Sequence, residues 1–294
     1  MDLALYLAQQ LVNAVSLGSV YALSAIGLSL VYGVLRLINF AHGDLLALGA
    51  YAALALLAVP RLPLGAALLL PVALVGAVGL AVERVAYRPI RRAPEVNALI
   101  VSLALSVIVQ NLLVMTLTAQ PRPFHLPPQL AGLLLLGGVV VSRMALLTTA
   151  LAVGLMTALH LMVRRTRVGT AIRATAEDRD AAELMGIPTD RVIGLTFALG
   201  AALGGFAGVM LGGQYGRIDP FMGFLPGLKA FVAAVLGGLG SVPGAILGGY
   251  LLGFGEILFV GLLPPALSGY RDAFVFTLLI LILLLRPQGV LAGR

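Results

Sequence analysis

Long apolar runs separated by short polar stretches fill almost the whole chain. Residues 3–35 contain no charged side chain, and this run exceeds the roughly 20 residues that a helix needs to cross a bilayer. It predicts either one tilted span or a short entry helix followed by a span. Further apolar runs of about spanning length lie at 62–82, 96–119, 144–163, 192–213 and 245–263. The pattern predicts an all-α, polytopic integral membrane protein.

Three apolar runs are shorter. Residues 45–59 end at Pro60 and make only a marginal span, so they predict a discontinuous or re-entrant helix. A stretch rich in Gly and Pro at 216–227 precedes a second short run at 228–239, and 273–285 closes the apolar part of the chain. Together the runs predict about nine crossings, or eight if one short segment is re-entrant, in a single transmembrane domain over residues 1–294.

The stretch 120–143 interrupts this pattern. It contains four prolines, and the nine residues LLLLGGVVV at 133–141 are too few for a helical crossing. A Gly137-Gly138 pair between two apolar runs is typical of a two-residue β-hairpin turn. We therefore expect 120–143 to form an external loop that carries a small hairpin.

Charge changes the picture at one place, residues 164–191, which we call the charged island. It contains eleven charged residues, although only 11% of the whole chain is charged and 60% is hydrophobic. If the island and every second loop from it face the cytoplasm, 13 of the 19 Lys and Arg residues lie inside. Because cytoplasmic loops are enriched in Lys and Arg, we expect a multi-pass protein of the bacterial inner membrane, with an external N-terminus and a cytoplasmic C-terminus.

Other chemistry is poorly represented. The net charge of +7 does not indicate nucleic-acid binding, because the basic residues lie in short loops between apolar runs, where they set orientation. The chain has no cysteine, and His42, His125 and His160 lie in different segments without the spacing of a metal site. We expect neither a metal nor a cofactor in this chain, and an intramembrane enzyme is a weak alternative.

Glycines recur every fourth residue in two apolar runs. The first set is Gly200, Gly204, Gly208 and Gly212, and the second is Gly240, Gly244 and Gly248. Such stripes let a neighbouring helix approach closely. The neighbour lies either in this chain or in a partner chain, and the pattern by itself leaves both open.

Polar side chains inside apolar runs are candidates for a translocation pathway, because each is costly against lipid and tends to face a cavity or a partner helix. Ser102, Ser106 and Gln110 fall on one helical face, and Asn13 has helical spacing from Gln9. For these residues the alternative is a structural role, in which the side chains bond within the protein.

Two charged residues in apolar runs are stronger candidates for the pathway. Lys229 is the only lysine of the chain, and Glu256 lies well inside an apolar run. Each either faces water along the pathway or belongs to a neutralising structural pair.

The charged island contains signals for one short helix. Asp180 and Glu183 have the spacing of a capping box, which predicts that a helix begins directly after Asp180. Gly186 can supply the left-handed residue after the helix, and Pro188 prevents its continuation. The expected helix therefore covers only residues 181–185.

A helix of five residues is not stable in water by itself. Because Ala181, Leu184 and Met185 share one face, we expect this helix to dock against a partner, and Thr189 or Asp190 to cap the span that follows. A push on the short helix would then reach the membrane helix. The alternative is a solvated loop whose charges only prevent translocation.

Four stretches, in order along the chain, carry a resemblance to a known family. They are SLGSVYALSAIGLSLVYGVLRLINFAHGDLLALGAY at 16–51, RVGTAIRATAEDRDAAELMGIPTDRVIGLTFALGAALGGFAGV at 167–209, GLKAFVAAVLGGLGSVPGAILGG at 227–249 and LRPQGVLAG near the end. They resemble the LivH-type permease subunits of ABC importers for branched-chain amino acids, and the resemblance covers essentially the whole chain.

The resemblance implies a coupling loop at 177–187, a cytoplasmic segment that sits in a groove of an ATPase. The residues implied in this coupling are Glu177, Asp178, Arg179, Ala181, Ala182, Leu184, Met185 and Gly186. The external loop at 120–143 then lies on the side where a solute-binding protein would dock.

The resemblance also implies a set of partners. They are a second related permease subunit, two cytoplasmic ATPase subunits that bind ATP and Mg, a periplasmic solute-binding protein and the lipid bilayer. The expected cargo is leucine, isoleucine or valine, with urea or short amides as the alternative within the same type of complex. A stand-alone secondary transporter or channel, with Lys229 and Glu256 as ion-coupling groups, is the alternative from another class.

Overall fold

The computed structural model describes residues 3–91, 93–286 and 289 of the chain. Within this part, seven helical segments are long and apolar enough to cross a membrane, and two apolar helices are shorter. The elements that contain the long segments are α1 (Leu3–Leu35), α3 (Leu64–Val82), α4 (Glu95–Leu117), α5 (Arg143–Arg165), α8 (Thr189–Tyr215), α10 (Val242–Leu262) and α11 (Arg271–Leu285). The short helices are α2 (His42–Leu57) and α9 (Phe224–Gly237). The all-α, polytopic fold is confirmed, and the chain is a multi-pass membrane protein.

Two of the long segments include a change of helix type. α3 continues through a π-helical turn, η1 (Glu83–Tyr87), and a 3-10 turn, η2 (Arg88–Ile90), whereas a 3-10 helix, η3 (Pro265–Tyr270), precedes α11. The first segment, residues 3–35, is one continuous helix, so no separate entry helix precedes it. Arg92 and Arg294, which count toward the predicted orientation, lie outside the described residues.

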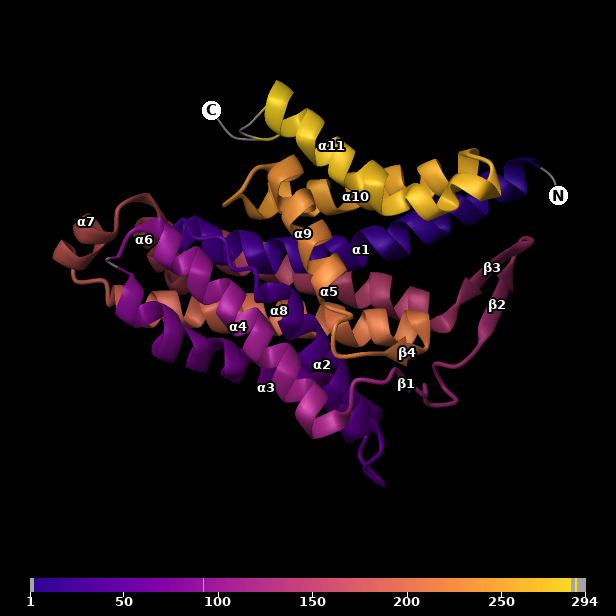
Figure 1. Cartoon of the computed structure of the whole chain (residues 1–294), viewed down its shortest axis with the longest axis horizontal. Helices are drawn as coiled ribbons and strands as arrows, with labels where there is room; N and C mark the ends of the chain where they lie inside the picture. The colour runs from indigo at the N-terminus through magenta and orange to yellow at the C-terminus, as the bar shows by residue number, and fades with distance from the viewer. Residues whose placement is uncertain (1–2, 92, 287–288, 290–294) are drawn as a thin grey trace.

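The short strands and the charged helices lie at opposite ends of the molecule. α6 (Arg167–Glu177) and α7 (Arg179–Leu184) form one end, and the hairpin of β2 (Leu133–Leu136) and β3 (Val139–Ser142) lies at the other end, near the start of α1 (Figure 1). A second strand pair joins β1 (Arg122–Pro123) to β4 (Arg217–Ile218).

The hairpin has the turn that its sequence predicts. Gly137 and Gly138 both have positive φ angles and connect β2 to β3 directly. On the neighbouring helix, Gln9 Nε2 donates a hydrogen bond to the carbonyl of Val140, and the backbone N–H of Val140 donates one to Gln9 Oε1, each at 2.8 Å. The hairpin is therefore fastened to the beginning of α1, while its position outside the membrane stays a prediction.

α1 and α8 form the centre of the bundle and are the most buried of the long helices. Glycines bring them together, because a side chain at Gly200 would meet the carbonyl oxygen of Gly27 at 2.6 Å. Gly208 lies in the same way against the backbone of Leu46 in α2, and Gly248 against that of Ala233 in α9. Both stripes thus pack against this chain itself, which is the intramolecular alternative of the sequence analysis.

The two short helices begin inside the bundle, and their first turns touch. Gly43 in α2 lies against the backbone of Gly223 and also against Gly227 in α9, with no room for a side chain. The N-terminal end of a helix carries a positive partial charge, so two positive ends converge here. The buried carboxylate of Asp44, in the first turn of α2, offsets them. α2 is the short helix that the run at 45–59 predicts, and α9 is a second helix of this kind that the sequence analysis did not predict.

Candidate functional site

The charged island contains two helices. α6 was not predicted. It begins after Thr166, whose side chain accepts a hydrogen bond from the backbone N–H of Gly169 at 3.0 Å, and it buries Ile172 and Thr175 on one face. Arg164 and Arg165 belong to the last turn of α5. The island is therefore mostly helical, and its connecting segments are shorter than the sequence suggested.

The predicted start of the short helix is wrong by two residues. α7 begins at Arg179, and its N-cap is Asp178, whose Oδ1 accepts a hydrogen bond from the backbone N–H of Ala181 at 2.9 Å. Asp180 lies within the first turn and Glu183 is not at the N3 position, so the capping box does not form. Asp178 caps the helix in place of Asp180 because Asp178 has the extended backbone that an N-cap needs.

The end of α7 follows the prediction. Gly186 has a φ of 80°, and its backbone N–H donates to the carbonyl of Glu183 at 3.0 Å, while the N–H of Ile187 donates to that of Ala182 at 3.0 Å. These two bonds make a Schellman motif, which satisfies the last carbonyls of the helix and reverses the chain. A side chain at Gly186 would be strained by its backbone conformation, although it would meet open space.

α7 exposes its apolar side chains. Leu184 and Met185 are 89% and 82% exposed, whereas Ala182 is buried against the rest of the chain. Ala181 is also exposed. The face that the sequence predicted to dock is thus largely exposed in the described part of this chain, and two large apolar side chains at the tip of a polar end are typical of a binding surface.

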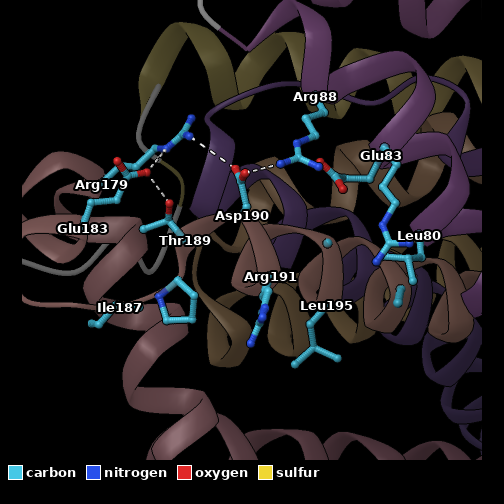
Figure 2. Close-up of a pocket in the computed structure, with 14 residues that line it drawn as sticks. Leu80, Glu83, Arg88, Arg179, Glu183, Ile187, Thr189, Asp190, Arg191 and Leu195 are labelled. Atoms are coloured by element: carbon cyan, nitrogen blue, oxygen red, sulfur yellow. Dashed lines mark hydrogen bonds and ion pairs between the residues drawn. The ribbon is translucent and has the colours of Figure 1, made fainter.

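Asp190 connects α7 to two membrane helices. It lies in the first turn of α8 and accepts a hydrogen bond from Arg88 at 2.5 Å (Figure 2). It also accepts one from Arg91 at 2.6 Å, and both arginines follow α3. Arg179 at the start of α7 lies 3.6 Å from the same carboxylate. The N-cap of α8 is Pro188, so the prediction that Thr189 or Asp190 caps this helix is wrong. The Thr189 side chain instead binds Glu183 of α7, and that of Asp190 binds the arginines after α3.

Thr189 and Glu183 fasten the other side of α7. The Thr189 hydroxyl donates to the carboxylate of Glu183, and Arg179 Nε donates to it at 3.2 Å (Figure 2). The hydrogen bond from Thr189 and then the contact with Arg179 hold the pKa of Glu183 below its ordinary value. The carboxylate therefore stays ionised at neutral pH, and α7 remains joined to the start of α8.

A hollow of about 850 Å³ lies between these groups and the end of α3. Its walls include the apolar side chains of Leu80, Ile187 and Leu195 as well as the arginines around Asp190 (Figure 2). Because α3, α7 and α8 all line it, a change in the position of α7 changes the shape of this hollow.

Removing Glu83 should destabilise the protein more than removing Asp190. The side chains of Glu83 and Arg91 are 2% and 3% exposed and form an ion pair, whereas the Asp190 side chain is 45% exposed. Glu83→Ala leaves a buried arginine with only Asp190 as its partner and should cost about 3–5 kcal/mol, against about 1 kcal/mol for Asp190→Ala. Thermal unfolding in detergent measures both, with Glu95→Ala, an exposed carboxylate of α4, as the control. Equal losses for Glu83→Ala and Glu95→Ala would contradict the expectation.

The predicted pathway residues do not form one cluster. Asn13 is exposed near the start of α1, where its side chain bonds to Gln9 at 3.2 Å and to Gln10 at 3.5 Å. It lies beside Gln9, the side chain that attaches the hairpin to α1. The position of Asn13 thus favours the structural alternative.

Ser102, Ser106 and Gln110 share one face of α4, as predicted, and that face points toward α2. Gln110 Nε2 donates to Asp44 Oδ1 at 2.8 Å and lies 3.2 Å from the hydroxyl of Ser106. Ser102 donates to the carbonyl of Leu99 in its own helix at 2.8 Å. Gln110 and Ser106 therefore surround the carboxylate at the meeting point of α2 and α9, and Ser102 bonds locally.

Lys229 and Glu256 are brought together, although they lie in different helices. Lys229 Nζ is 2.9 Å from Glu256 Oε1, Tyr21 donates a hydrogen bond to this carboxylate, and Arg271 forms an ion pair with it. Both charged groups are buried. The neutralising pair considered in the sequence analysis is present, and it is part of a larger group of charges.

Three charged residues of these clusters were missed from the sequence. Asp44 directly follows Gly43 before a short apolar run, a placement that could have been read as the first turn of a broken helix. Arg271 and Asp272 precede the last apolar run, where charges usually mark only the membrane edge, so no local signal distinguishes them. Among the described residues, no group of three or more His, Cys, Asp and Glu side chains is arranged to hold a metal ion.

Known proteins match almost the entire chain. The family described as "branched-chain amino acid transport system / permease component" matches residues 10–283. The high-affinity branched-chain amino acid transport system permease protein LivH of Salmonella typhimurium is 43% identical over 303 residues, which cover 99% of this chain and 96% of that protein. BraD of Pseudomonas aeruginosa, a permease protein of the same description, is 43% identical over 299 residues, covering 97% and 95%. No solved structure gives a significant match.

Proposed function

Because this chain belongs to the family of branched-chain amino acid transport permeases, we propose that it is the transmembrane permease subunit of an ATP-driven importer that carries leucine, isoleucine and valine into the cell. The observation that supports this most is the match over almost the full length of LivH and BraD, whose names specify this transport. The permease itself performs no covalent chemistry.

In this proposal α7 is the docking element for a cytoplasmic ATPase. Leu184 and Met185 enter a groove of the ATPase, and the surrounding residues Glu177, Asp178, Arg179, Ala181, Ala182 and Gly186 shape and position the helix. Asp190 and Glu183 transmit its displacement, since they join α7 to α8 and to the end of α3. ATP and Mg are bound by the ATPase and not by this chain.

The two ends of the molecule would bind the remaining partners of the importer. Two ATPases at the α7 end would serve two permease subunits, this chain and a related second one. The opposite end, which carries the β2–β3 hairpin and the start of α1, faces the periplasm and receives a solute-binding protein. This orientation agrees with the excess of arginine at the α7 end. It places the N-terminus outside and the C-terminus in the cytoplasm.

The crossing of α2 and α9 supports a transport role. Transporters commonly place discontinuous helices near the membrane midplane, where the helix ends and freed backbone groups face the cargo. Movement of α8, which packs along α2, would carry the displacement of α7 to this crossing. Alternation between outward and inward access then releases the cargo at an inward-facing site of lower affinity.

The test is purification of this chain with its associated subunits, followed by ATPase measurements in proteoliposomes. We expect a co-purifying ATPase whose hydrolysis rises when the binding protein loaded with L-leucine, L-isoleucine or L-valine is added. Absence of any ATPase would favour a stand-alone secondary transporter. Stimulation by urea or a short amide, and not by these amino acids, would overturn the assignment of the cargo.

A further inference from the structure

A pocket of about 730 Å³ lies at the end of the bundle opposite α7. Side chains from α1, α8, α9 and α11 line it, together with Arg217 of β4, a strand labelled in Figure 1. Its volume is within the range of about 300–1,000 Å³ that is typical of sites for small molecules. None of the coupling residues contributes to it.

The floor of this pocket is formed by opposite charges. Lys229 Nζ lies 2.9 Å from Glu256 Oε1 and 2.7 Å from Asp272 Oδ1. Arg271 Nε lies 2.9 Å from the same oxygen of Glu256. Two cations and two anions therefore balance one another in a region where an uncompensated charge would be costly.

The two carboxylates that contact Lys229 are held very differently. Glu256 is fully buried and accepts hydrogen bonds from Tyr21 at 2.9 Å and from Lys229, in addition to its contact with Arg271. The side chain of Asp272 is 40% exposed as a whole, and its Oδ1, which faces Lys229, is buried but makes no hydrogen bond of ordinary geometry within the described residues. Glu256 is thus a fixed structural counter-ion, whereas Asp272 is the carboxylate that a ligand can replace.

Apolar side chains form part of the wall of this pocket. They include Leu211 of α8, Met222, and Leu225 and Pro226 of α9, while Arg217 and Asp219 add one further charge of each sign to the lining. A site that combines balanced charges with apolar side chains suits a small zwitterion with an aliphatic side chain. It suits an uncharged polar molecule such as urea poorly, because nothing apolar in such a molecule would cover this wall.

We propose that this pocket receives the amino acid on the periplasmic side, an inference that rests on the proposed function. The carboxylate of the amino acid takes the place of Asp272 on Lys229, its ammonium group binds the released Asp272, and its aliphatic side chain packs against Leu225. One internal ion pair is replaced by two pairs with the ligand, so binding adds no net charge to the pocket.

The position of Lys229 gives this site a connection to the transport movement. Lys229 belongs to α9, whose first turn rests on Gly43 of α2. A ligand that binds Lys229 therefore acts on a discontinuous helix and not on a lipid-facing one. Exchange of Asp272 for the ligand also loosens the link between α9 and α11.

Direct binding of radiolabelled L-leucine tests the proposal, with the full chain and its co-purifying subunits in nanodiscs and without the binding protein. Asp272→Asn should weaken leucine binding about tenfold or more, which corresponds to the loss of one charge-assisted hydrogen bond. Glu95→Gln, which neutralises an exposed carboxylate of α4 outside the pocket, should leave the Kd unchanged.

Competition against the wild-type protein supplies a second measurement that does not depend on a variant. 3-Methylbutylamine lacks the carboxylate and 4-methylpentanoate lacks the ammonium group, so each should compete at least about tenfold more weakly than L-leucine. Equal competition by either compound, or wild-type affinity in Asp272→Asn, would overturn the proposal.

The same preparations separate this proposal from the proposed function. A co-purifying ATPase stimulated by the loaded binding protein, together with unchanged leucine binding in Asp272→Asn, overturns the pocket alone. Leucine binding that requires Asp272, in a preparation without any ATPase, supports the pocket and overturns the importer assignment. Absence of leucine binding to the wild-type protein overturns the pocket in either case.

Discussion

Replacing Leu184 with aspartate is expected to reduce ATP hydrolysis stimulated by the loaded binding protein about tenfold or more, with a similar loss of leucine uptake. The Leu184 side chain makes almost no contact within this chain, so its only large burial would be in the groove of the ATPase. Placing an unpaired carboxylate in an apolar groove costs roughly 2 kcal/mol or more, which corresponds to at least a tenfold weaker interaction. Hydrolysis and uptake in proteoliposomes measure the effect.

Val168→Asp is the matched control for this variant. Val168 is an exposed apolar residue of α6 at the same end of the molecule, outside the face formed by Leu184 and Met185. It should retain stimulation close to that of the wild type. Leu184→Asp should unfold within about 0.5 kcal/mol of the wild type, as surface substitutions do. The unfolding of Val168→Asp is measured alongside it, because Val168 is 42% exposed. Normal coupling in Leu184→Asp would show that α7 is not the docking element.

A large loss of stability from a single added methyl group is expected for Gly208→Ala. The new Cβ would lie against the backbone of Leu46, and backbone atoms at this contact cannot move aside as the end of a flexible side chain can. α8 and α2 would have to separate, which should lower the free energy of unfolding by about 1–3 kcal/mol or more. The midpoint of thermal unfolding in detergent measures this loss.

Gly154→Ala is the control for the change of residue type. Gly154 lies in the interior of α5, and a Cβ there would meet open space. Because alanine favours a helix over glycine by about 0.5–1 kcal/mol, this substitution should be neutral or slightly stabilising. If Gly208→Ala were as stable as Gly154→Ala, the close contact between α8 and α2 would not be required for the fold.

The sequence was most informative where one signal decides the local structure. Long runs without charge predicted the spans, because a helix satisfies its own backbone hydrogen bonds and can therefore cross the hydrocarbon core. Gly137 and Gly138 determined the hairpin turn, and Gly186 determined the end of α7, because these positions need positive φ angles that other residues rarely adopt.

Prediction failed where several residues compete for one role. Asp178 and Asp180 are both acceptable N-caps, and only the backbone conformation before α7 selects the first. α6 was missed because its eleven residues are half polar, and its stability depends on the burial of Ile172 against the bundle.

Contacts between segments that lie far apart in the chain could not be predicted from the sequence either. Lys229 and Glu256 belong to different helices, and no local spacing indicates that they meet or that Asp272 joins them. Asp44 offsets the positive ends of two helices only because α9 begins where α2 begins. Such placements follow from the packing of whole helices, for which a single sequence contains no direct signal.

The crossing of α2 and α9 has a mechanical consequence. Gly43 and Gly223 meet through their backbones, so the contact contains no side-chain rotamers that must be repacked when the helices change their angle. Small sliding movements between packed helices normally require their side chains to stay in nearly the same rotamers. A contact without side chains removes that restriction, so α2 and α9 can change their angle at this point without repacking side chains.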